Sequence, residues 1–155
     1  MAITTAMCNS FKQELLAMSH ASSDTFKIVL IKAGHTGTYG ASTTNVGTPG
    51  SGSPSTSNLG TDAVAASGDY NSVNGMTLAG FAASLDTSTG ILTFTDPAAW
   101  TGTTISADGA IIYNSTQSNK AVAVFSFGGT VASTAGDFNV NLPAATAAAG
   151  LIRIA

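Results

Sequence analysis

The side chains of this sequence that could support metal binding or acid–base catalysis are two histidines and eight acidic residues. A zinc site needs His, Cys or carboxylate ligands at fixed spacings. No such ligand lies at such a spacing from His20 or His35, so the sequence predicts no metal site. His20 follows a predicted helix, where interaction with the helix dipole explains it. His35 stands in a glycine-rich turn and is expected to be solvated.

The aspartates are spread along the chain and do not form an obvious catalytic pair. Asp62 and Asp69 lie in a segment rich in Gly, Ser and Thr. Others stand at turns or strand starts, namely Asp86, Asp96, Asp108 and Asp137. Aspartates at such places accept backbone hydrogen bonds, and we favour that role over a glycosidase pair or a calcium site, which stay open. The sequence has no Gly-x-Ser-x-Gly motif and no phosphate-binding loop. It therefore predicts no catalytic residue, no cofactor and no enzyme.

Three aromatic side chains could stack on a sugar: Trp100, Tyr39 and Tyr70. Aromatic rings serve in binding sites and also fill cores. Trp100 stands close to Pro97, and a hydrophobic lid on the fold explains it more simply. Carbohydrate binding through these three residues is kept as an alternative.

Charged residues make up 8% of the 155 residues, whereas soluble domains carry roughly 25%. The net charge is −3, and the few cations are scattered. Nucleic acid and anionic membranes need clustered cations, so neither is an expected partner. The single cysteine, Cys8, excludes an internal disulfide. A surface this poor in charge has little protection against association, so we expect a partner to cover much of it.

Two apolar runs, residues 110–113 and 121–127, predict a pair of strands at the centre of the fold. The polar connection between them is too short for a helical crossover, so the pair should be an antiparallel hairpin. The second run is apolar on both faces, which is typical of a strand inside a sheet. Gly128-Gly129 is expected to end it. Further strands are expected at residues 26–31, 76–85, 91–94, 104–107, 137–142 and 151–154.

One short helix is expected near the N-terminus. Ser10 and Gln13 have the spacing of a capping box. Phe11, Leu15 and Met18 then form one apolar stripe at helical spacing. With seven or eight short strands and glycine-rich turns, the pattern predicts a single all-β domain over residues 1–155. The expected architecture is an antiparallel β-sandwich of jelly-roll type.

Two segments fall outside these elements. Residues 1–9 form an apolar arm. Residues 34–75 contain few large apolar side chains, so they cannot offset their own ordering entropy by burial. We expect a long flexible insertion, or else a loop held by a neighbour.

Four segments of the chain together resemble a family of small structural proteins of tailed bacteriophages. They are MAITTAMCNSFKQELLAMSH, SDTFKIVLI, DGAIIYNSTQSNKAVAVFSFGG and LIRIA, about half of the sequence. Members are commonly treated as capsid cement, or decoration, proteins with a jelly-roll sandwich. The family has no catalytic residues to carry over. The chain departs from the family at residues 34–75, which are longer and richer in Gly and Ser.

The resemblance implies a virion protein on the outer surface of the capsid, made in the cytoplasm of a host bacterium. Its expected partners are the major capsid protein, whose neighbouring subunits it would bridge, and itself, as a homodimer or homotrimer. The residues expected to contact the capsid are Ile3, Met7, Phe11, Tyr39 and Tyr70. The alternative is a tail- or fibre-associated β-sandwich that recognises host carbohydrate.

Overall fold

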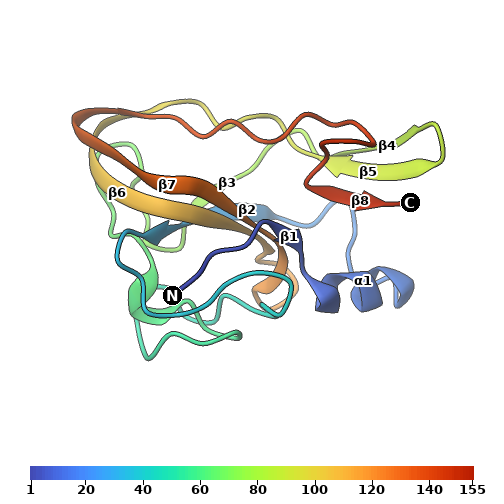
Figure 1. Ribbon diagram of the computed structural model, residues 1–155, viewed down its shortest axis with the longest axis horizontal. Helices are drawn as coiled ribbons and strands as arrows, with labels where there is room; N and C mark the ends of the chain where they lie inside the picture. Colours follow the sequence, from blue (N-terminus) through green and yellow to red (C-terminus); the bar gives the residue numbers. More distant parts are fainter.

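A computed structural model describes residues 1–155 as a mostly β protein with antiparallel sheets and one short α-helix (Figure 1). In chain order the elements are β1 (Ala6–Met7), α1 (Asn9–Leu16), β2 (Phe26–Lys32), the 3-10 helix η1 (Gly60–Asp62), β3 (Met76–Thr77), β4 (Ala82–Asp86), β5 (Thr89–Thr93), β6 (Trp100–Asn114), β7 (Lys120–Phe138) and β8 (Ile152–Ile154). A large sheet has the strand order β1-β7-β6-β2-β3, and a small sheet has the order β4-β5-β8. The predicted all-β class with a single N-terminal helix is confirmed.

β6 and β7 form the predicted antiparallel hairpin, and β6 lies between β7 and β2. The hairpin is longer than predicted, because Trp100 pairs with Phe138 at its far end. The expected break at Gly128-Gly129 is wrong. Ala107 pairs with Val131 while the next pair starts at Ser126, so the glycines form a bulge inside the ladder. Gly128 has a φ of +77°, which glycine adopts without strain.

Two of the expected strands differ from the structure. Residues 76–85 divide into β3 and β4, which belong to different sheets. The expected strand at 137–142 ends at Phe138. Its alternation is nevertheless visible in burial, since Phe138 and Val140 are buried and Asn139 and Asn141 are exposed. The alternating pattern therefore indicated correctly which side chains point inward, although residues 139–142 have no neighbouring strand to pair with.

The helix does not use the predicted capping box. Cys8 occupies the N-cap position and makes no side-chain cap hydrogen bond. The Ser10 hydroxyl has no hydrogen-bond partner, although it is buried. Ser10 lies inside the first turn because β1 pairs with β7 up to Met7, and the chain enters the helix directly from that strand.

Residues 34–75 pack against the large sheet. Six of their apolar side chains are buried: Tyr39, Val46, Leu59, Ala63, Val64 and Tyr70. The Val64 N–H donates to the Leu30 carbonyl of β2 at 3.0 Å, and the Asn119 carbonyl in the β6–β7 turn accepts from the Val46 N–H at 3.1 Å. The segment is therefore a loop held by its neighbours, in place of a flexible insertion. Residues 1–9 are likewise not a free arm, because Thr4 bonds to Tyr39 and β1 joins the sheet.

Candidate functional site

The small sheet carries one apolar face. Ala83 pairs with Leu92, which pairs with Ile152, and Leu85 and Ile154 both pair with Gly90. Residues that pair in this way lie on the same face of a sheet. Ile112 of β6 lines a small hollow together with Leu92 and Ile152, so the inner part of this face packs over the large sheet. Leu85 and Ile154 pair with Gly90, next to the turn between β4 and β5. The β4–β5 hairpin and the end of β8 extend beyond the large sheet (Figure 1).

The other face of the small sheet is covered by the segment that leads into β8. The Ala147 N–H donates to Asp86 Oδ2 at 2.7 Å. Arg153 donates to the carbonyls of Ala147 and Ala148. Ile91 is buried on the same side. This segment therefore covers the part of the other face around Ile91 and Asp86, whereas Ala82 and Ser84 at the β4 edge stay exposed.

The helix α1 lies across from the apolar face, and the two enclose a groove of about 220 Å³. Phe11 and Leu15 come from α1, whereas Ala83, Leu92 and Ile154 come from the small sheet. Phe11 is fully buried at the base of the groove. We call this groove, with the exposed side chains at its open end, the apolar end.

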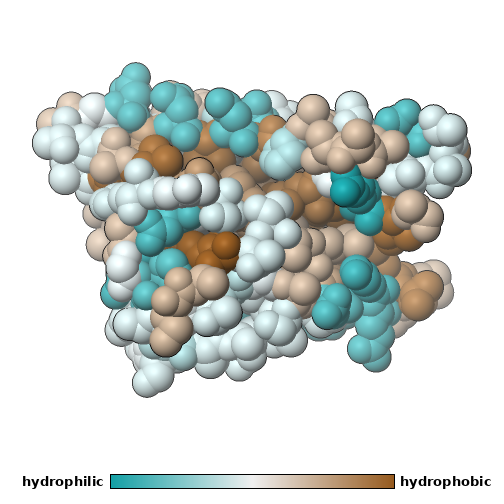
Figure 2. All heavy atoms as spheres, in the orientation of Figure 1, coloured by the Kyte–Doolittle hydropathy of each residue, from teal (hydrophilic) through white to brown (hydrophobic).

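Large apolar side chains at the apolar end face water. The exposed fractions are 88% for Leu16, 89% for Met18, 73% for Leu85 and 52% for Ile154. Figure 2 shows brown spheres at this end of the molecule, where β8 and the end of α1 lie. Leu16 and Ile154 line one further hollow with Met7. Single exposed apolar residues are ordinary, but a group of them around a groove indicates a binding surface.

A partly buried hydrogen-bond network fixes α1 and the residues after it. His20 Nε2 lies 2.8 Å from Glu14 Oε2, and His20 Nδ1 lies 2.9 Å from Asn114 Nδ2. Asn114 also donates to Asp24 Oδ2 at 2.7 Å. The His20 ring packs against Phe11 at a tilt of 56°, with centroids 4.8 Å apart. His20 therefore joins the helix to the central hairpin, which corrects the explanation by the helix dipole alone.

The carboxylate at the other side of this network is stabilised in its charged form. The backbone N–H of Ala21 and then the Asn114 amide lower the pKa of Asp24 below its ordinary value. Lys120 lies 3.6 Å from Glu14 Oε1. The position of α1, and with it one wall of the groove, thus depends on polar groups of the hairpin turn.

Two further aspartates hold the loop 34–75 at the opposite side of the fold. Asp108 accepts from Thr130 and Gly34 and lies 3.2 Å from His35 Nδ1. The Thr130 hydroxyl is the main cause of a lowered Asp108 pKa. The His35 side chain is only 8% exposed and its Nε2 has no partner, so the expectation that His35 is solvated is wrong.

Asp62 is fully buried and accepts hydrogen bonds from Thr36, Gly37 and Tyr39. Burial acts to raise its pKa, but the N–H groups of Gly37 and Thr36 and the Tyr39 hydroxyl outweigh burial and lower it. The contacts of these aspartates are to groups of the loop and the hairpin and, for Asp62, to Lys32 of β2 at 3.8 Å. Nowhere do three His, Cys, Asp or Glu side chains come together as a metal site would require.

The structure separates the five residues that were expected to contact the capsid. Phe11, Tyr39 and Tyr70 are core residues. Tyr39 donates to Asp62 at 2.8 Å, and Tyr70 accepts from the Leu30 N–H at 3.1 Å. This corrects the expectation that these three side chains face a partner. Ile3 is half-buried against the core, and Met7 is half-buried beside the apolar end.

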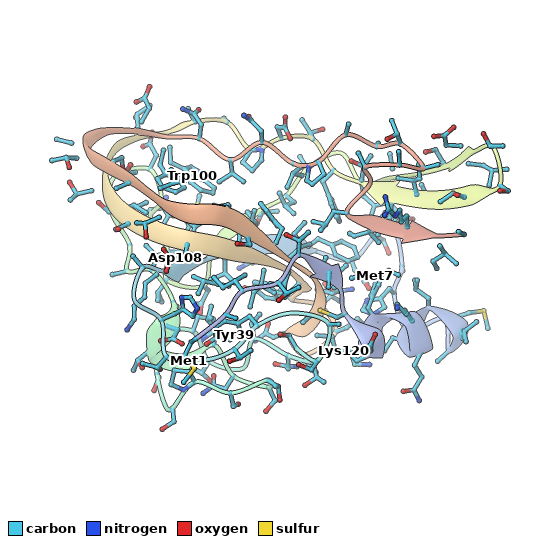
Figure 3. The ribbon with its side chains drawn as sticks, viewed as in Figure 1. Met1, Met7, Tyr39, Trp100, Asp108 and Lys120 are labelled. Atoms are coloured by element: carbon cyan, nitrogen blue, oxygen red, sulfur yellow. The ribbon has the colours of Figure 1, made fainter.

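The three aromatic residues considered for sugar stacking are also buried. Trp100 is 5% exposed and packs edge-on against Tyr70, with centroids 5.1 Å apart. Figure 3 shows Trp100 and Tyr39 on opposite sides of the β6–β7 hairpin, so the two rings do not form one platform. No stacking surface is built from these residues in this fold.

Sequence reasoning placed Met18 on an inward stripe and gave Leu85 and Ile154 no role beyond their strands. Their exposure depends on the overhang of the small sheet, which no local pattern reports. In the structure α1 ends at Leu16, and Met18 has a φ of +53°. The stripe therefore cannot continue as a helix to Met18.

The chain matches no protein-family model, no curated protein and no solved structure. The fold offers no helix with the length and apolar character that a bilayer crossing requires. What the arrangement itself provides is a rigid β body with an apolar groove at one end, and this geometry is suited to binding another protein.

Proposed function

We propose that this chain is a structural protein of a tailed-phage head, which binds the outside of the capsid and bridges neighbouring major capsid protein subunits. The observation that carries the proposal is the apolar end, where the exposed Ile154 lines the groove and a neighbouring hollow that it shares with the exposed Leu16. Met18, which follows α1, and Leu85, which belongs to the small sheet, are exposed as well. The resemblance of four chain segments to capsid decoration proteins supports the same function.

The scarcity of charge supports a permanent assembly. Only 13 of 155 side chains are Asp, Glu, Lys or Arg, so most of the surface has little electrostatic protection against association. A specific contact buries about 800 Å² per partner. A protein that bridges two subunits makes its second contact intramolecularly, so two modest contacts give a stable attachment.

The jelly-roll assignment belongs to the same proposal. One antiparallel sheet partly covering another is the general arrangement of a β-sandwich. The small sheet of three strands is the layer that the resemblance would match to the second sheet of a jelly roll.

The test uses heads of the phage that encodes the chain, purified and freed of this protein. Purified chain is added back, and its copies per head are measured after sedimentation. We expect saturable binding in many copies, and at least tenfold weaker binding for the double variant Leu16→Ser, Met18→Ser. Apolar contacts of two such side chains contribute about 3 kcal/mol when fully buried, which allows this loss.

Val131→Ser is the matched control, because Val131 is also an exposed apolar residue, at 42%, but lies on the distant part of β7. The control should bind like the unchanged protein. Failure of the unchanged chain to bind heads, or equal binding by the double variant, would contradict the proposal. Binding on a glycan array instead would favour the carbohydrate alternative.

A further inference from the structure

The strand β4 is an unprotected sheet edge. The outer side of β7 beyond β1 is also open, but its ladder with β6 is interrupted by several register shifts, and such bulges are one of the usual protections of an edge. The β4–β5 ladder has no such interruption. The large sheet ends in β1 and β3, which have two residues each. The small sheet ends in β8, with three residues that include Arg153, and in β4, with five. Short strands and charged side chains are the usual protection of an edge. β4 has neither along Ala82–Leu85, where every residue is exposed.

No backbone group of β4 bonds to any element other than β5. In an antiparallel pair, every second residue directs its N–H and C=O away from the partner strand. The outer side of β4 therefore presents unpaired donors and acceptors to solvent. Such a row is a template for one more strand.

We propose that β4 pairs with β4 of a second copy, antiparallel and around a two-fold axis at Ser84. This register places Ser84 opposite Ser84, Ala83 opposite Leu85, and Ala82 opposite Asp86. We assign the added strand to a second copy of the chain because the two β4 strands are complementary to each other in this register. Leu85 meets a small apolar residue, and small side chains at the axis permit a close approach.

Charge also favours this register. Asp86 is the only charged residue of β4. Antiparallel pairing centred on Ser84 separates the two Asp86 residues by four positions, about 14 Å at ~3.4 Å per residue. Parallel pairing in register would place them side by side. An isologous contact of this kind closes as a dimer and leaves no further copy of the edge exposed.

The result would be one six-stranded sheet, β8-β5-β4 continued by β4-β5-β8 of the second copy. Its apolar face would bring two apolar ends into one assembly. The pairing can be tested apart from the proposed head binding, because its contacts are made by the β4 backbone and by Ala83, Ser84 and Leu85, whereas the head-binding test changes Leu16 and Met18. If both hold, one dimer presents two docking surfaces and can bridge two capsid subunits.

Cysteine cross-linking tests the pairing at the axis. In Ser84→Cys the two introduced thiols face each other, with Cα atoms about 4.5–5.5 Å apart, within the range that a disulfide spans. The matched control is Ser88→Cys in the turn after β4, which is also exposed and lies away from the axis. The native Cys8 is fully buried, and burial raises the pKa of its thiol to about 12, so it stays an inert background.

After mild oxidation we expect a covalent dimer for Ser84→Cys and a single chain for Ser88→Cys. Unchanged protein should sediment at twice the 15.3 kDa of one chain, and Ser84→Lys should sediment as one chain while unfolding at the same denaturant concentration. Equal cross-linking of both cysteine variants would overturn the pairing. So would a dimer that Ser84→Lys leaves intact, or a protein that stays monomeric throughout.

The outcomes separate the two proposals. A β4 dimer that does not bind phage heads keeps the pairing and removes the proposed function. A chain that stays monomeric but binds phage heads to saturation keeps the proposed function and removes the pairing.

Discussion

The loop 34–75 buries its large apolar side chains, whereas the apolar end exposes several of its own. The loop is rich in Gly, Ser and Thr, yet its large side chains Tyr39, Leu59 and Tyr70 are buried. The apolar end is built from an ordinary helix and ordinary strands, yet Leu16 and Leu85 are exposed. Composition alone would predict an exposed loop and a buried helix face and strand face. The difference indicates that the loop contributes to the body of the protein, whereas the exposed side chains of the apolar end do not, and the proposed function assigns them to a partner.

The largest effect on stability is expected from removal of the Asp62 carboxylate, which holds the loop. Asp62→Ala removes the acceptor of the Thr36 and Gly37 N–H groups and of the Tyr39 hydroxyl. Buried donors without an acceptor cost about 1–3 kcal/mol each, so we expect the free energy of unfolding to fall by about 3 kcal/mol or more in urea titrations. Asp137→Ala is the control, since Asp137 is exposed and surface changes stay within about 0.5 kcal/mol. Equal stability of the two variants would mean that the loop adds little to the body.

The central hairpin and β2 could be predicted because their apolar runs are continuous and both faces are covered. β2 has Ile28, Val29, Leu30 and Ile31 completely buried, and such a run indicates an inner strand whatever its neighbours are. The arrangement of the loop could not be predicted in this way. Its order depends on Asp62 meeting Tyr39 and on Val64 bonding to β2, contacts between residues far apart that have no local signal.

The apolar end was harder to predict than the hairpin for a related reason. Phe11, Leu15 and Met18 are spaced as one face of a helix, but only Phe11 is fully buried. Whether a patterned residue is buried depends on what lies opposite it, and here the small sheet stops short of closing on α1. Periodicity identifies a face of an element and does not say whether that face is covered.

Acid should weaken the loop side of the molecule. The pKa of Asp62 is lowered in the folded state, so the folded protein binds fewer protons than the unfolded chain at pH values below the ordinary Asp pKa of about 3.8. The stability from this group is present above that pH and is lost as the pH falls toward the lowered pKa. We expect the free energy of unfolding to decline below about pH 4.

Asp62→Asn identifies the share of Asp62 in this decline. It removes one of the titrating groups, while Asp24 and Asp108, whose pKa values are also lowered, continue to titrate. The variant should therefore lose stability less steeply with acid than the unchanged protein. An unaltered slope in Asp62→Asn would show that Asp62 does not hold its charge in the folded loop.

The smallest expected effect is at the apolar end. Leu16→Ser in the isolated protein should change the free energy of unfolding by no more than about 0.5 kcal/mol, because a side chain that is 88% exposed loses almost no packing. The same substitution, combined with Met18→Ser, is expected to weaken head binding at least tenfold. A residue that matters for binding and not for folding is the mark of a surface kept for a partner. A loss of more than about 1 kcal/mol in urea titrations of Leu16→Ser would instead place Leu16 among the packed residues of the body, and the contrast between the two regions would no longer hold.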